Sequence, residues 1–201
     1  MKRIILITII FISGSFSIFA QGLYFDIGAG IGKSWAKIDG KDVAKAFNLT
    51  GSNIKEDPTL DLGLKIGYGP FEPFPIYIVG ELGFVVTTGT ITPSDANYNF
   101  TSFIVGPGIL FYPVPIMQLG LSLGYSFVYT NFYSPPVDKS KWHPAGFAWN
   151  ISVGLNIGGQ YNSILIGAKY FMAINNVENN KNLITSMIGG FVKYSFRHKP
   201  T

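Results

Sequence analysis

The segment IMQLGLSLGYSFVYT, residues 116–130, alternates large apolar residues with small or polar ones. Every second residue from Met117 to Tyr129 is large and apolar, and the residues between them are mainly Gly, Ser and Gln. A period of two residues is that of an extended strand, whose side chains point alternately to opposite faces. The segment therefore predicts a β-strand with one apolar face and one small, polar face.

The same alternation recurs in seven further segments, residues 22–34, 59–69, 75–87, 100–112, 147–158, 163–172 and 184–196. Both faces are apolar in two of them, where we expect Phe103, Val105, Ile109 and Phe111, and Ile188, Val192, Tyr194 and Phe196, to face outward. The eight strands would run to roughly 10 to 14 residues. Strands that cross a membrane need about 9–11 residues, whereas strands of soluble proteins usually have about 5–6.

The connections between these strands alternate in length. Residues 70–75, 112–115 and 158–162 form short turns, whereas residues 37–58, 88–97, 131–146 and 174–182 are longer and polar. Short turns on one side and long loops on the other are typical of an up-and-down outer-membrane barrel. Within the first long loop, residues 42–48 (DVAKAFN) predict one or two helical turns, which Gly51 would end.

The volume of a small barrel decides which face meets lipid. The interior of an eight-stranded barrel is just wide enough to be filled by side chains, so the large apolar set does not fit inside. We therefore expect the apolar set to face lipid and the small, polar set to fill the lumen, which disfavours a soluble barrel. Aromatic residues near both strand ends predict two interfacial girdles: Trp35, Tyr125, Phe127, Tyr129, Phe147 and Trp149, and Tyr68, Phe111, Tyr112, Tyr161, Tyr194 and Phe196.

The first twenty residues have the pattern of a secretory signal peptide. Lys2 and Arg3 precede an apolar run from Ile4 to Ile12, and Ala20 is a small residue suited to cleavage. We expect residues 1–20 to be the signal peptide, residues 21–196 the barrel domain and residues 197–201 a short periplasmic tail. The formal charge of +4 is mild and gives no reason to expect a nucleic-acid partner.

These features resemble the small eight-stranded outer-membrane barrels of the OmpA/OmpX type. The resemblance covers residues 21–196 and implies an all-β, antiparallel, up-and-down transmembrane barrel. In that family the last strand ends in an aromatic residue that the barrel-assembly machinery reads, and Phe196, with Tyr194 and Val192 in step, looks like that signal. The five residues after Phe196 depart from the family pattern.

The sequence contains few residues that could act in catalysis or bind a metal. His143 lies near Ser140 and Asp138, but the three residues fall within one predicted loop, and a catalytic triad depends on fixed geometry. We expect His143 and His198 to be solvated, and we predict no catalytic residues, cofactor or metal site. With 0 Cys residues, the chain has no thiolate metal site and no disulfide.

Six charged residues have the parity of the inner face, namely Asp26, Asp61, Lys65, Glu81, Lys169 and Lys193. Charges at membrane depth are expected to pair. The turn at 70–75 places Lys65 opposite Glu81, barrel closure brings Asp26 near Lys193, and Lys169 should reach Glu81 or Asp61. Because Tyr77, Phe171 and Phe191 also point inward, we expect a filled lumen rather than an open channel.

The expected function is that of a monomeric surface protein of the bacterial outer membrane, with a structural, adhesive or ligand-binding role. Four long loops would be exposed at the cell surface, where recognition by rigid scaffolds tends to occur, and both termini would be periplasmic. The expected partners are outer-membrane lipid, the assembly machinery and an extracellular ligand. A small pore is the alternative function, and a lipid-modifying enzyme is the third.

Overall fold

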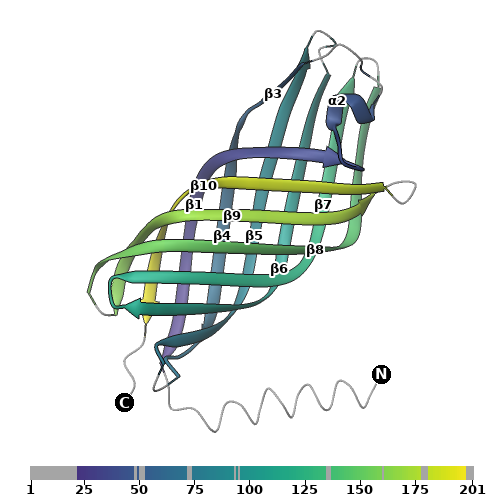
Figure 1. Cartoon of the computed structure of the whole chain (residues 1–201). Coiled ribbons are helices and arrows are strands. Elements are labelled where there is room, and N and C mark those ends of the chain that lie inside the picture. Colours follow the sequence, from purple (N-terminus) through teal and green to yellow (C-terminus); the bar gives the residue numbers. More distant parts are fainter. Residues whose placement is uncertain are drawn as a thin grey trace, which may run out of the picture.

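The chain folds into a closed antiparallel β-barrel, as the computed structural model in Figure 1 shows. The structure describes residues 22–47, 49, 53–71, 74–92, 94, 96–134, 137–159, 161–177 and 181–197. Eight strands form the ring: β1 (Leu23–Ile38), β4 (Pro58–Tyr68), β5 (Ile76–Thr92), β6 (Ala96–Val114), β7 (Met117–Ser134), β8 (Val137–Gly158), β9 (Asn162–Val177) and β10 (Lys181–Arg197). Each pairs with its neighbour in the chain, and β10 pairs with β1 to close the sheet, so the predicted fold is confirmed.

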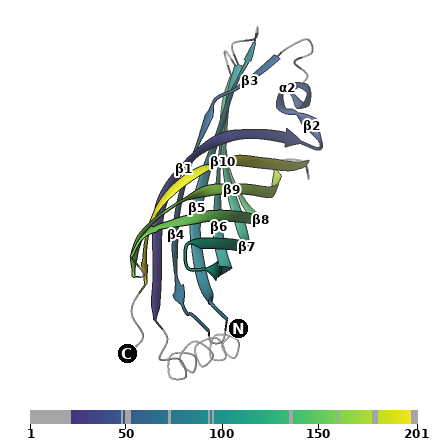
Figure 2. The same cartoon turned by 60° about the vertical axis from the view of Figure 1, so that its left-hand side comes forward.

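Three short elements lie at one end of the barrel. β2 (Lys41–Asp42) pairs with β1, and β3 (Asn53–Glu56) pairs with β5. Between them, α2 (Val43–Ala46) is the helical turn that the sequence predicts, whereas Gly51 lies outside the described residues. We call this end the α2 end and the opposite one, near Leu23 and Arg197, the terminus end (Figures 1 and 2).

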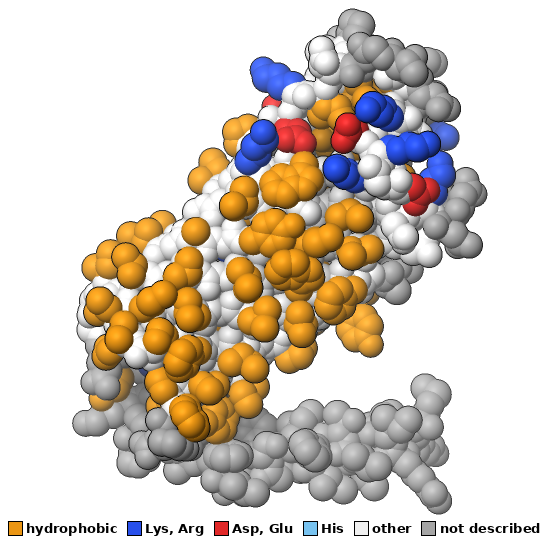
Figure 3. Space-filling model, viewed as in Figure 1, with side chains coloured by type: hydrophobic (Ala, Val, Ile, Leu, Met, Phe, Trp, Pro, Cys, Tyr) orange, Lys and Arg blue, Asp and Glu red, His pale blue; other side chains and the backbone are white. Residues whose placement is uncertain are grey.

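The described helix is far too short to span a membrane. The predicted outer and inner faces of the strands are confirmed by the exposure of their side chains. Outward-facing residues such as Ile31, Leu121 and Ile151 are exposed, whereas Ser122 and Asn150, their neighbours along the chain, are buried. The two segments with apolar residues on both faces are also oriented as expected, with Ile109 and Val192 exposed. Figure 3 shows the result, an apolar belt over most of the barrel with charged side chains gathered beyond it at the α2 end.

The strands at the α2 end are longer than expected, and the long loops are correspondingly shorter. The ring strands have between 11 and 22 residues, because β5, β6, β7 and β8 continue as paired ribbons beyond the apolar belt. Most of the predicted loops 88–97, 131–146 and 174–182 are therefore strand. Antiparallel pairing satisfies the backbone groups as it extends, and Thr and Tyr residues in these segments suit a pleated surface.

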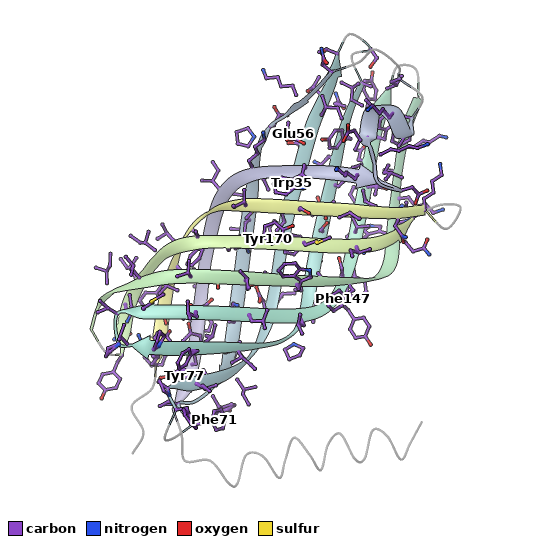
Figure 4. All side chains as sticks on the ribbon, viewed as in Figure 1. Trp35, Glu56, Phe71, Tyr77, Phe147 and Tyr170 are labelled. Atoms are coloured by element: carbon purple, nitrogen blue, oxygen red, sulfur yellow. The ribbon has the colours of Figure 1, made fainter. Side chains whose placement is uncertain are left out.

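A cluster of aromatic side chains lies on the outer surface toward the α2 end. Tyr170 packs against both Trp35 and Trp149, at ring distances of 6.3 and 5.2 Å. Figure 4 places Trp35 and Tyr170 on this part of the barrel, with Glu56 beyond them and Tyr77 near the terminus end. One predicted girdle residue is wrong. Tyr112 faces the lumen and is 4% exposed, since its parity on β6 is opposite to that of Phe111.

Candidate functional site

The lumen holds a layer of paired charges near mid-height. Lys65 on β4 and Glu81 on β5 are direct cross-strand partners, and Lys65 Nζ lies 3.0 Å from Glu81 Oε2. Asn150 on β8 donates to both carboxylate oxygens of Glu81 at 2.8 Å, and Lys65 donates to Ser122 Oγ at 3.1 Å. Charged groups removed from water need such partners, because an isolated buried charge is costly.

Barrel closure brings Asp26 and Lys193 together. Lys193 on β10 lies opposite Gly28 on β1, two residues from Asp26, and its Nζ is 3.7 Å from Asp26 Oδ1. A side chain at residue 28 would collide with Lys193, since a Cβ there would lie 2.4 Å from Lys193 Cγ. Gly28 therefore leaves the space through which the lysine reaches Asp26.

The third pair joins opposite sides of the barrel. Lys169 on β9 donates to Asp61 on β4 at 2.5 Å, rather than to Glu81. All six predicted lumen charges are therefore buried and grouped in three ion pairs. The inward parity of Asn150 and Ser122 can be read from the sequence, but only the structure shows that both belong to this network.

A layer of tyrosines fills the lumen at the terminus end. Gln118 donates to the hydroxyl groups of Tyr24 and Tyr112, and the Tyr24 hydroxyl donates to Asp26 at 2.9 Å. Arg197, expected in the tail, is the buried last residue of β10, with its guanidinium group 4.5 Å from the centre of the Tyr112 ring. The rest of the predicted tail, including His198, lies outside the described residues.

Above the charged layer, the lumen is filled by hydroxyl, amide and apolar groups. Ser102 and Thr185 lie 2.8 Å apart across the barrel, and Ser126 donates to Asn175 at 2.9 Å. Buried Phe171 packs between these groups and the ion pairs in an apolar cluster with Val85, Ile104, Ala148, Ala173 and Met187. The interior is thus occupied by side chains from the terminus end to beyond mid-height, as an eight-stranded barrel requires.

A cavity of about 180 Å³ lies at the α2 end, and we call it the mouth chamber. Its apolar wall is formed mainly by Ile38, Ala46, Phe47, Phe100, Phe132 and Leu183. Its polar groups come from Thr130, Lys139, Lys141 and His143 on the β7–β8 ribbon and from Lys181 at the start of β10. The chamber therefore combines an apolar interior with a basic rim.

His143 differs from its prediction. It is 8% exposed rather than solvated, because β8 continues through it and pairs it with Val128 on β7. Its Nε2 lies 3.1 Å from Thr130 Oγ1. The exposed Ser140 pairs with Asn131, and the side chain of Asp138 lies outside the described residues. In the part of the chain that the structure describes, no cluster of acidic and histidine side chains could hold a metal ion.

The residues predicted to signal assembly lie on the outer face of the closing strand. Val192 and Tyr194 are exposed and Phe196 is partly exposed, opposite Ala29, Ile27 and Phe25 of β1. Tyr194 also donates to Asn162 on β9 at 2.8 Å. These three side chains therefore belong to the outer, apolar face of the barrel.

A closed ring of eight strands, an apolar outer belt and a polar lumen define the class of protein as a small transmembrane β-barrel. No protein-family model matches the sequence, and no curated protein matches it. Solved structures do match. Neisserial surface protein A superposes with a TM-score of 0.57 at 11% identity, over 85% of this chain and 95% of that one.

Two further barrels are similar. Ail, the attachment invasion locus protein of Yersinia pestis, gives a TM-score of 0.52 at 18% identity, covering 86% of this chain and 99% of that one. A major outer membrane protein of Thermus thermophilus gives 0.51 at 9% identity, over 87% and 98%. The chain therefore has the fold of the small outer-membrane β-barrels of the OmpA/OmpX type.

Proposed function

We propose that the protein is a surface-exposed binding protein of the bacterial outer membrane, in which the closed barrel is the anchor and the α2 end carries recognition. The observation that carries this proposal is the contrast between the two parts of the interior. The lower lumen is filled by three ion pairs and a tyrosine layer, whereas the α2 end contains a chamber with exposed lysines.

The orientation follows from the distribution of charge and length. Charged side chains and extended ribbons lie at the α2 end, while short turns and both ends of the described chain lie at the other. Outer-membrane barrels have short periplasmic turns and longer extracellular segments. These features support the α2 end as the extracellular end, with residues 1–20 as the signal peptide that directs export.

Barrels of this shape can carry binding surfaces. Ail is named as an attachment protein, and one of its structures holds a heparin analogue, sucrose octasulfate. The protein proposed here would act by binding rather than by catalysis.

Epitope insertion in intact cells tests the orientation. A tag inserted after Ser52, which lies between α2 and β3 in the sequence, should bind antibody without permeabilisation, whereas one inserted after Gln160 should require it. The opposite pattern would reverse the proposed topology. Both insertions should retain the heat-dependent gel shift of a folded barrel, which serves as the control.

Single-channel recording separates the binding role from a pore. The purified protein in planar bilayers should show no steady conductance, because the three ion pairs and the tyrosine layer occupy the lumen. Regular unitary steps that change in size on Lys65→Met would support the pore instead.

Mass spectrometry of lipid A tests the third possibility, a lipid-modifying enzyme. Lipid A from cells with and without the protein should show no difference in mass.

A further inference from the structure

We infer that the mouth chamber binds a small amphipathic anion, with a body about as large as one aromatic ring and a single carboxylate head. This inference rests on the proposed function, because it names the ligand class of the extracellular end. Ligand sites are usually concave and mostly apolar, with a few polar groups that orient the ligand. The mouth chamber has this composition.

The apolar wall accounts for the body of the ligand. Phe100 and Leu183 are 2% and 1% exposed and belong to a buried apolar cluster at the α2 end. Phe47, after α2, stacks on Phe132 of β7 with ring centres 3.9 Å apart and an interplanar angle of 14°. An apolar cavity of about 150 Å³ is large enough for benzene, so a chamber of about 180 Å³ accepts one ring or a short acyl chain.

The basic rim accounts for the head group. Lys139, Lys141 and Lys181 contribute to the lining together with His143, and no acidic residue is among the described lining residues. Lys139 and Lys181 are exposed, so their ammonium groups can approach an anion at the opening without leaving water. Unlike Lys33, which lies 3.9 Å from Glu56, Lys139 and Lys181 make no ion pair with any described residue.

The structure beneath the chamber explains why a ligand would stop there. Ser102 and Thr185 meet across the lumen at 2.8 Å, and Ser126 donates to Asn175 at 2.9 Å. Phe171 and Met187 pack below them and are almost fully buried. The apolar body would be held above this layer, with its carboxylate directed toward the lysines.

Ligand-observed fluorine NMR on the full protein in lipid nanodiscs tests the inference with 4-(trifluoromethyl)benzoate as the probe. Matched titrations use 4-(trifluoromethyl)benzyl alcohol, which has a similar body and no charge, and empty nanodiscs, which report partition into lipid. We expect saturable binding of the anion and at least tenfold weaker binding of the alcohol.

Variants locate the site. Lys139→Gln with Lys181→Gln should weaken probe binding at least fivefold, whereas Lys37→Gln with Lys55→Gln, the same charge change on exposed strand residues outside the chamber, should leave it unchanged. Ala46→Trp should abolish binding by filling the chamber. The heat-dependent gel shift verifies that each variant is folded.

Several outcomes would overturn the inference. They are equal binding of the alcohol, an equal loss in both lysine pairs, retention in folded Ala46→Trp, or no saturable binding to the folded protein. These outcomes are separable from failure of the proposed function. Probe binding with an inaccessible tag after Ser52 would leave the chamber as a site and refute only its extracellular orientation.

Discussion

Lys65 and Glu81 face one another across the β4–β5 hairpin, and their charged groups lie 3.0 Å apart inside the barrel. Both side chains are almost completely buried. Asn150 adds two hydrogen bonds to the same carboxylate from the far side of the lumen. Because Lys65 also donates to Ser122, the pair belongs to a network that joins four strands, β4, β5, β7 and β8.

Neutralising one partner of this pair should destabilise the barrel. Breaking a buried pair from one side costs about 3–5 kcal/mol, because the remaining charge stays without compensation. Glu81→Gln should therefore lower the free energy of unfolding, measured by urea titration in micelles, by an amount near this range. Asp39→Asn, at an exposed turn, is the control and should change it by less than about 0.5 kcal/mol. Equal effects of the two substitutions would contradict the assigned role.

The contribution of Asn150 to stability should be largest while Glu81 is charged. Asn150→Leu removes two hydrogen bonds to a carboxylate, and bonds to charged groups contribute about 1.5–3 kcal/mol. In a Glu81→Gln background the same substitution should cost clearly less. A double-mutant cycle on the free energy of unfolding measures this coupling, and strict additivity would show that the two residues act independently.

The apolar belt predicts a depth-dependent penalty for charge. Leu121 lies on the outer face between Ile109 and Ile151, so Leu121→Arg should destabilise the barrel in lipid by about 2–4 kcal/mol. Tyr133, near the end of the β7 ribbon, is also exposed but lies beyond the belt, and Tyr133→Arg should cost about 0–1 kcal/mol. The free energy of unfolding in vesicles measures both effects. A larger loss for Tyr133→Arg than for Leu121→Arg would contradict the assigned position of the membrane along the barrel.

Glu56 predicts a pH dependence at the α2 end. Burial raises the pKa of the Glu56 carboxyl, nearby Lys33 partly opposes the shift, and Asp42 adds to it. A pKa raised in the folded state means that its contribution to stability is present below the ordinary value of 4.5 and is lost as pH rises through the folded pKa. Glu56→Gln should therefore gain stability relative to the natural chain between pH 4 and pH 7.

Paired melting curves at the two pH values test this expectation. The melting temperature of Glu56→Gln minus that of the natural chain should be greater at pH 7. Lys33→Met, which removes the opposing charge, should strengthen the pH dependence of the natural carboxyl. A difference that shrinks on going from pH 4 to pH 7 would mean that the ion pair with Lys33 outweighs burial.

The three ion pairs show which contacts inside a barrel can be predicted from the sequence. Lys65 and Glu81 could be matched from the sequence because a short turn fixes the register of one hairpin. Asp26 and Lys193 could be matched because the first and last strands of a closed barrel must pair. The partner of Lys169 remained open between Glu81 and Asp61, since the choice depends on strand tilt and on the distance across the lumen.

The mouth chamber could not be predicted in the same way. Its residues come from α2 and six strands of the ring, and residues as far apart as Ile38 and Leu183 meet only when the barrel closes. His143 shows the same limit, because a polar segment with Pro and Lys predicts a loop, yet pairing of β8 with β7 buries the ring. Outside the membrane, whether a segment forms a strand depends on the neighbouring strand with which it pairs.

The sequence alone determined the eight strands of the ring, the lipid-facing set and the inward charges, because a period of two residues separates the faces of every strand regardless of its neighbours. The tertiary structure alone decided the length of the ribbons beyond the belt, the partner of Lys169, the inward position of Arg197 and the mouth chamber. These features depend on distances between residues remote in the chain, which only strand register, barrel tilt and closure establish.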